Sequence, residues 1–154
     1  MKKIFVNLIL ILMLSNCGYA PIYSNKNFNF DLNKITKKEN SKLNSNIAKN
    51  LRVFSNADNP NKIYLKLDSK KVINIIAKDK KGNPSRYDMS ITMIVDVEYR
   101  ENKTMQKTFA ENFNYNTSAN KFELSQYEKE IEELLIDKII EDCITYLSKI
   151  LNDN

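Results

Sequence analysis

The clearest pattern in the chain is a strict alternation of apolar and polar residues between Tyr87 and Tyr99. Every odd-numbered position of this stretch is apolar, and all but one of the positions between them are polar. Side chains of a β-strand point alternately to its two faces, so the alternation predicts a long strand with one buried and one solvent-facing side. We expect Tyr87 and the rest of the odd-numbered row to lie in the core.

Three further segments have the features of strands. Residues 63–67 alternate apolar with polar, residues 72–78 form a short β-branched run, and residues 105–115 again carry apolar side chains at odd positions. A turn over residues 80–85 precedes the long strand, and a polar turn follows it, so the last two strands should form an antiparallel hairpin. The apolar odd positions of the last segment are Met105, Phe109, Phe113 and Tyr115.

Two segments instead show helical spacing. One follows Ser41, a residue type that suits a helix N-cap, and ends before the polar turn of residues 55–61. Its apolar positions are Leu43, Ile47, Leu51 and Phe54. The other runs from Leu124 to Ile150, with glutamates in its first half and Lys149 in its last turn, as the helix dipole favours. We interpret the glutamate-rich face as solvated.

The element order follows once a short first strand is added. Residues 28–33 alternate apolar and polar, which predicts that strand, and the polar residues 34–40 read as a loop. The order is then β-α-β-β-β-α. Two amphipathic helices and a sheet with one apolar face predict an α+β fold, a two-layer α/β sandwich in which both helices pack on one face of a four-stranded mixed sheet. We assign residues 27–154 to this single domain.

The N-terminal segment differs from the rest of the chain. A basic start followed by a short apolar run is typical of a secretory signal peptide, and the run is far shorter than the roughly 20 residues of a membrane-spanning helix. The run ends at Cys17. Residues 14–17 resemble the bacterial lipobox, although Asn16 stands where Gly or Ala is usual. We therefore predict a lipoprotein signal peptide over residues 1–16 and a tether over residues 17–26.

The lipobox resemblance implies that Cys17 becomes the lipidated first residue of the mature protein, carrying a diacylglyceryl group and an N-acyl chain. One acyl chain binds a membrane only marginally, whereas two or more anchor firmly. Gly18 follows the cysteine, which resembles the pattern of lipoproteins sorted to the outer membrane. The alternative is an ordinary signal peptide with an incidental cysteine.

Composition removes several classes of site. The chain has no His and only two Gly. Without His, a Ser-His-Asp triad, a Cys-His dyad and a His-ligated metal are all impossible. Two glycines cannot build a phosphate-cradling loop or a dinucleotide fingerprint. We therefore predict no catalytic residues, no metal site and no cofactor apart from the lipid on Cys17.

Net charge and the second cysteine change the picture less. The formal charge is +5, but removal of residues 1–16 leaves 22 basic and 19 acidic residues, a charge of +3. This mild excess gives no reason to expect a nucleic-acid partner. Cys143 stands among isoleucines of the last helix, so we expect a buried thiol without a reactive role.

Taken in order, several short motifs resemble the LptE family of lipopolysaccharide-assembly lipoproteins. Residues 17–23 (Cys-Gly-Tyr-Ala-Pro-Ile-Tyr) resemble the family's Cys-Gly-aromatic start. Residues 81–87 (Lys-Gly-Asn-Pro-Ser-Arg-Tyr) resemble its turn into a long strand that begins with Tyr. Residues 113–116 (Phe-Asn-Tyr-Asn), followed by a Glu-rich amphipathic helix, resemble its last strand and helix. The resemblance covers nearly the whole mature chain.

This resemblance implies a fold of two helices on a four-stranded sheet. It also implies a non-enzymatic role in the outer membrane, within the lumen of the LptD β-barrel, where LptE-like proteins help the barrel to assemble. Lipopolysaccharide is then a second partner, bound during delivery to the outer leaflet.

The family's lipopolysaccharide contacts imply a set of candidate binding residues. A basic residue before the long strand corresponds to Lys80, with Lys81 beside it and Arg86 across the turn. A second family basic residue near the start of the last helix has no counterpart in register, and Lys121 is the nearest one. Lysines at a turn approach lipid phosphates without prior desolvation, but they also simply keep a surface soluble.

Two other functions remain open. One is a stand-alone lipid- or solute-binding lipoprotein that serves an ABC-type transport system, although the chain offers no second domain to close a cleft. The other is an anchored hydrolase, which would need a carboxylate pair or a Ser-Lys dyad. No pair of residues in the sequence stands out as such a site.

Overall fold

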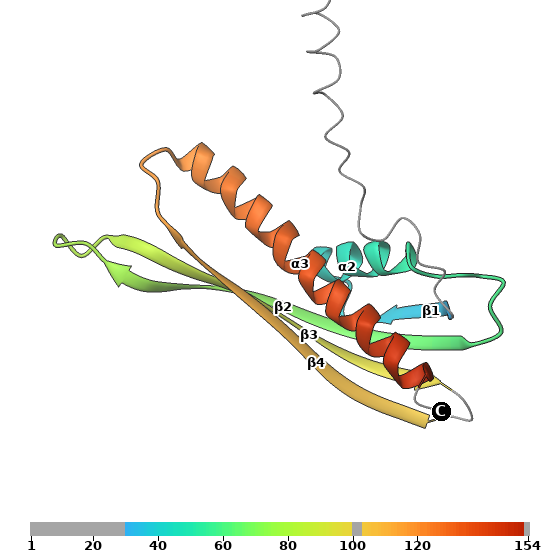
Figure 1. The fold of residues 1–154 in the computed structure, drawn as a ribbon. Helices are drawn as coiled ribbons and strands as arrows, with labels where there is room; N and C mark the ends of the chain where they lie inside the picture. The colour runs from blue at the N-terminus through green and yellow to red at the C-terminus, as the bar shows by residue number, and fades with distance from the viewer. Residues whose placement is uncertain (1–29, 100–102, 153–154) are drawn as a thin grey trace, which may run out of the picture.

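The computed structural model describes residues 30–99 and 103–152 of the 154-residue chain (Figure 1). This part of the chain forms four strands and two helices. In order they are β1 (Asp31–Lys37), α2 (Lys42–Arg52), β2 (Lys62–Lys78), β3 (Pro84–Tyr99), β4 (Lys103–Asn116) and α3 (Lys121–Asn152). The predicted signal peptide (residues 1–16), the lipidation candidate Cys17 and the predicted tether (residues 17–26) lie outside the described residues.

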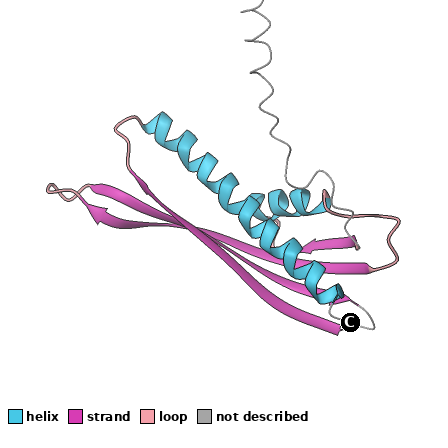
Figure 2. Cartoon of the chain, in the orientation of Figure 1, coloured by secondary structure: helices cyan, strands magenta, loops and turns pink. Residues whose placement is uncertain are grey.

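The four strands form one mixed sheet in the order β1-β2-β3-β4. β1 runs parallel to β2, whereas β3 pairs antiparallel with both β2 and β4. Both helices cover the same face of the sheet (Figure 2), and within the described residues no helix covers the other face. The structure therefore confirms the predicted α+β sandwich, with two helices on one face of a four-stranded mixed sheet.

The alternation in β3 builds the centre of the core. Its odd-numbered side chains from Met89 to Val97 are fully buried beneath the helices. Residues paired across neighbouring strands point to the same face, so these side chains meet Ile63, Leu65 and Leu67 of β2, which are also buried. From α3, Cys143 is fully buried among isoleucines, as predicted.

Tyr87 differs from the rest of its row. We expected it in the core, but its side chain is only half-buried. Its partner on β2 is Ile75, which is itself exposed. The N-terminal end of α2 reaches β2 only as far as Ser69, whose hydroxyl donates to the Asn44 side chain. That helix therefore cannot bury Tyr87, which stacks instead on Tyr115 with 5.5 Å between ring centroids.

The first strand extends further along the sequence than predicted, and the first two residues of the predicted strand, 28 and 29, lie outside the described residues. We expected residues 28–33 to be extended and residues 34–40 to be a loop, but β1 continues to Lys37. The register of β1 against β2 shifts between Leu32 and Lys34. Before this shift the buried side chains include Leu32, and after it Ile35. The shift moves the buried positions from even to odd numbers. The alternation of apolar and polar residues is therefore interrupted inside the strand, and it does not reveal that the strand continues.

Two other strands also depart from the pattern. Residues 63–67 and 72–78, which look like separate runs, belong to the single strand β2, because β3 pairs with it continuously past the polar residues between them. In β4, the expected apolar row is only partly covered. Phe109 and Tyr115 are buried, but Met105 is exposed, because β4 is the outermost strand of the sheet.

Local hydrogen bonds set the position of α2. The Ser41 hydroxyl accepts the backbone amide of Asn44 at 3.0 Å, which confirms Ser41 as the N-cap. The fully buried Asn44 side chain then donates to the carbonyl of Glu39 at 2.9 Å and accepts the hydroxyl of Ser69. These bonds attach the start of the helix to β2.

The long helix α3 buries one face along the sheet. Its buried residues are Leu124, Ile131, Leu135, Ile136, Ile139, Ile140, Cys143, Ile144, Leu147 and Leu151. Tyr127 and Leu134, which follow the predicted helical spacing, are exposed instead, in the first half of the helix. In the described part of the chain, no helix is long and apolar enough to cross a membrane.

Candidate functional site

The turn between β2 and β3 is the predicted site with the best-defined geometry. Residues 79–83 form it, and the Asp79 carboxylate holds it together from within. That carboxylate accepts the backbone amides of Lys81 at 2.8 Å and Asn83 at 2.9 Å. The amide of Asp79 donates in turn to the carbonyl of Asn83 at 2.8 Å. Hydrogen bonds to the carboxylate, led by that from the Asn83 amide, hold the pKa of the Asp79 carboxyl below its usual value.

Gly82 completes the turn because its backbone lies in the left-handed region, at a φ of 85°. L-residues with a Cβ rarely adopt this conformation, whereas glycine adopts it freely. The Gly82 amide donates to the carbonyl of Asp79 at 3.0 Å. One of the chain's two glycines is thus placed where the turn requires it.

The lysines of this turn point their charge into solvent. We call Lys78, Lys80 and Lys81 the basic turn. All three are exposed, and none forms an ion pair with another described residue. Because Asp79 is occupied with backbone amides, it does not draw either neighbouring lysine into a salt bridge. The basic turn is therefore an exposed cluster of cations that can approach anionic groups.

The other two predicted residues do not join this cluster. Arg86 pairs with Asn116 of β4, and by the alternation of β3 it lies on the face opposite Tyr87, away from the helices. Lys121 is the first residue of α3, on the helix side. The starts of β3 and α3 both lie at the end of the molecule that carries the turn between β2 and β3 (Figure 1). The structure thus brings Lys80 and Lys81 together but separates Arg86 from Lys121.

An aromatic cluster fixes α3 to the sheet near this end. The Tyr115 hydroxyl donates to the Glu128 carboxylate at 2.7 Å, and the Tyr127 ring meets Tyr115 edge-on at 6.2 Å. Burial, followed by the hydrogen bond to Glu128 and then by the charge of Glu128, raises the pKa of Tyr115 above its ordinary value. Tyr115 therefore stays protonated and keeps donating this hydrogen bond.

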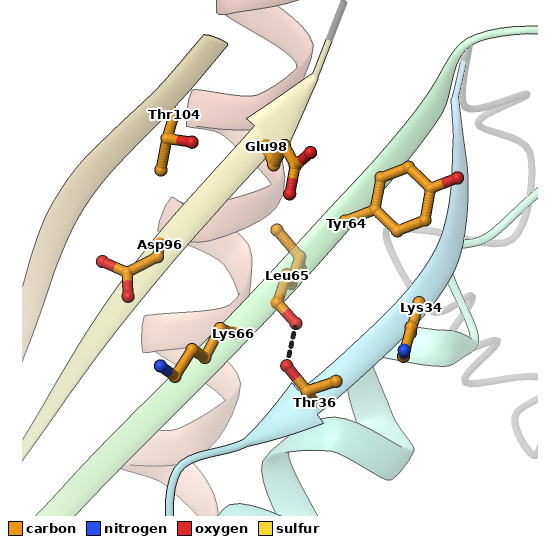
Figure 3. A pocket seen from close by; sticks show the side chains of 8 residues that line it. All are labelled: Lys34, Thr36, Tyr64, Leu65, Lys66, Asp96, Glu98 and Thr104. Atoms are coloured by element: carbon orange, nitrogen blue, oxygen red, sulfur yellow. Dashed lines mark hydrogen bonds between the residues drawn. The ribbon is translucent and has the colours of Figure 1, made fainter. Parts of the chain in front are cut away.

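A second surface feature was not predicted. It is a polar depression of about 440 Å³ on the helix-free face, around the parallel part of the sheet (Figure 3). Its lining residues come from all four strands: Lys34, Thr36, Tyr64, Leu65, Lys66, Asp96, Glu98 and Thr104. Two lysines and two carboxylates give it balanced charge, and Gln106 donates to Asp96 at 2.7 Å. Among the described residues, no group of side chains is suited to hold a metal ion.

The signal for this depression is present in the sequence but dispersed. Apart from Leu65, the residues that β2 and β3 contribute occupy even-numbered positions, the polar side of the alternation. Which of them are neighbours depends on the register of four strands, and the sequence does not state that register.

Comparison with known proteins finds solved structures with a similar fold. No protein-family model matches the chain, and no curated protein sequence matches it. Solved structures do match. Rare lipoprotein B from Shewanella oneidensis is 14% identical, with a TM-score of 0.55 over 78% of this chain and 98% of that one.

Two further lipoproteins are similar. A minor lipoprotein from Acinetobacter baumannii has a TM-score of 0.59 and 10% identity, over 79% of this chain and 92% of its own. Lipoprotein B from Nitrosomonas europaea has a TM-score of 0.58 and 7% identity, over 83% and 90%. At such identities the likeness shows a shared fold, and it covers nearly the full length of these structures.

Proposed function

We propose that this chain is a non-enzymatic outer-membrane lipoprotein of the LptE type. In this proposal it associates with the β-barrel LptD, assists the assembly of that barrel, and takes part in binding lipopolysaccharide and delivering it to the outer leaflet. The observation that carries the proposal is the fold shared with rare lipoprotein B, which is LptE under another name.

Independent support comes from the order of motifs along the chain. The lipobox-like cysteine, the glycine turn before a Tyr-led strand and the Glu-rich last helix occur in the order of the LptE family. The structure places the second of these as an exposed turn at one end of the sheet. Lipidation at Cys17 remains part of the proposal, and it would anchor the domain through the tether of residues 17–26.

Lipopolysaccharide offers phosphates, which suit the basic turn. Lys80 and Lys81 are exposed, so they can meet a phosphate without first losing an internal partner. Each acts as a point charge on a flexible stem, whereas Arg86 can bind bidentately from the other face of the sheet. In this proposal Lys80 and Lys81 make the main contact, and Arg86 and Lys121 lie at its margins.

Charge reversal in the turn tests this binding role. The variant Lys80→Asp with Lys81→Asp should bind purified lipopolysaccharide at least about tenfold more weakly at low salt, because two attractive charges become repulsive. Unfolding midpoints should stay close to those of the wild type, since both side chains are exposed and the turn is closed by Asp79 and Gly82. Titration at two salt concentrations provides the measurement.

The matched control is Lys34→Asp with Lys66→Asp. It makes the same change in net charge on exposed lysines of the polar depression. We expect this control to bind lipopolysaccharide nearly as well as the wild type. Equal binding by the turn variant and the wild type would remove the basic turn from the proposal, and a loss in the control alone would move the site to the depression.

The alternative, a stand-alone lipid- or solute-binding lipoprotein that serves an ABC-type transporter, predicts a different partner. The described residues form one two-layer unit, with no second lobe to close over a solute. Isolation of the lipoprotein with a transporter, and without a large outer-membrane barrel, would favour this alternative.

A further inference from the structure

Much of β2 has a neighbouring strand on one side only. β1 pairs with β2 up to Lys37 opposite Leu67, and Lys38 donates its amide to the Leu67 carbonyl at 2.9 Å. β3 pairs with β2 along nearly its whole length, to Lys78. Within the described residues, nothing pairs with the other edge of residues 68–78, and Figure 1 shows β1 beside one end of β2 only. We call this segment the open edge.

The hydrogen-bonding groups of the open edge can be assigned. The Leu67 carbonyl points toward β1. Because the direction of backbone groups alternates along a strand, the N–H and C=O groups of Ser69, Lys71, Ile73 and Ile75 point to the same side. Their side chains lie on the helix face, as the ion pair of Lys71 with Glu132 at 2.6 Å shows.

The side chains here are unusually apolar for an exposed edge. Residues 72–77 contain no charged residue and no proline. Ile73, Ile75 and Ile76 are 41%, 50% and 47% exposed. An exposed β-branched edge of this kind is a template for another strand, and folded proteins ordinarily cover or blunt it. The register irregularity between Ile75 and Ala77 marks where the regular edge ends.

We propose that residues 69–75 of β2 accept an extended strand from a partner polypeptide, one that carries acidic residues flanking a short apolar stretch. The added strand would continue the sheet beyond the end of β1 and bond to the outward groups of residues 69, 71, 73 and 75. The inference goes beyond the proposed function, and it holds whether or not the donor is the barrel.

Charge selects the kind of strand. Lys70 and Lys71 precede the apolar run and Lys78 follows it. Lys71 already pairs with Glu132, whereas Lys70 and Lys78 are exposed and form no ion pair with another described residue. Opposite charges on facing strands stabilise a pair of strands, whereas like charges destabilise it. A second copy brings further lysines to the same edge, so a strand with acidic flanks fits it better.

Backbone chemistry distinguishes a polypeptide from a lipid. An acyl chain lying on this edge would cover exposed isoleucines but would also bury N–H and C=O groups that have no partner. A buried N–H or C=O group without a hydrogen-bond partner destabilises the complex. A β-strand covers the same isoleucines and supplies a partner for every one of these groups.

The test uses the full-length lipoprotein in the cell envelope, with a photo-crosslinking amino acid in place of Ile75. We expect a crosslink to one polypeptide, mapped by mass spectrometry to a short extended segment with Asp or Glu beside it. The same crosslinker in place of Thr104, at the exposed edge of β4, should not capture that segment.

Two substitutions then separate the lost hydrogen bond from the lost side chain. Ile73→Pro removes an N–H that bonds to nothing in the isolated sheet, so the fold should persist, while the crosslink at residue 75 should fall at least tenfold. Ile73→Val keeps the N–H and should stay within about twofold of the wild type. If Ile73→Pro does not fold, amide exchange of the wild type decides instead. The amides of residues 69, 71, 73 and 75 should exchange more slowly in the partner complex than in the purified protein.

Several results would overturn the inference. These are the absence of any crosslink, a crosslink only to glycolipid or to a second copy, an equal yield from Ile73→Pro, and unchanged amide exchange in the complex. The proposed function fails separately. If the wild type captures a polypeptide strand here but never a large outer-membrane barrel, the docking edge stands and the LptE-type role falls.

Discussion

Two polar side chains are buried in the described part of the chain, Asp31 and Asn44, and both are fully partnered. Asn44 attaches the start of α2 to β2, as its bonds to Glu39 and Ser69 show. Asp31 does the same at the other end of α2, where its carboxylate accepts the Ser55 hydroxyl at 2.6 Å and the Lys62 ammonium at 2.8 Å. Single residues thus fix the helix to the parallel strands at both ends.

Asp31→Asn should lower the free energy of unfolding by about 1–3 kcal/mol at neutral pH, because it removes a charge-assisted bond at a buried site. The Lys62 bond, followed by the Ser55 bond, lowers the pKa of Asp31 in the folded protein. A lowered folded pKa means that this stabilisation is complete above the unfolded value of about 4 and disappears as the pH falls through the folded value.

Urea unfolding of both proteins at pH 7 and at several values below pH 4 measures this effect. The difference between wild type and variant should shrink steadily on acidification. A difference that stays constant with pH would show that the carboxylate charge is not the source of the stabilisation.

Cys143 should be inert while the protein is folded. Burial raises the pKa of its thiol to about 12, so almost no reactive thiolate exists near neutral pH. In a soluble form of residues 17–154 with Cys17→Ser, a disulfide-exchange reagent should label Cys143 only after denaturant is added. Rapid labelling of the native protein at pH 8 would contradict the buried placement.

At the scale of elements, local signals predicted local structure. The alternation of β3 and the Ser41 cap were both visible in the sequence, because each depends on residues a few positions apart. The end of β1 was missed because a register shift after Leu32 changes which positions are buried. The continuity of β2 was missed because its polar residues 68–71 look like a break in the sequence. Their pairing with β3 keeps them in the strand.

Ser41→Ala tests the capping of α2. Loss of the hydroxyl leaves the Asn44 amide without its partner and should cost about 1 kcal/mol in unfolding free energy. Ser41→Asp is the matched control, because it keeps an acceptor at the cap and adds a favourable interaction with the helix dipole. Denaturant titration should rank Ser41→Asp at or above the wild type and Ser41→Ala below it. The same stability in Ser41→Ala as in the wild type would show that the cap contributes nothing.

At the scale of the whole molecule, the two faces of the sheet and its two ends differ. Helices cover one face, and the other carries an open polar depression. One end carries the basic turn, the half-buried Tyr87 and the open edge of β2. The turn and its lysines could be predicted, because Gly82 and Pro84 mark it in the sequence. The separation of Arg86 from Lys121, the depression and the open edge could not, because each depends on how distant strands are aligned.

The central claim is that this domain works as the lipoprotein partner of a large outer-membrane barrel. The most direct test is affinity purification of the tagged full-length chain from detergent-solubilised outer membranes, with mass spectrometry of the intact assembly. The control is the same chain with Cys17→Ala, which should no longer reach the membrane fraction. We predict a stable one-to-one complex with an LptD-type barrel, with no other partner in comparable amount. Recovery of the lipidated protein alone, or with a transporter and no barrel, would contradict the account.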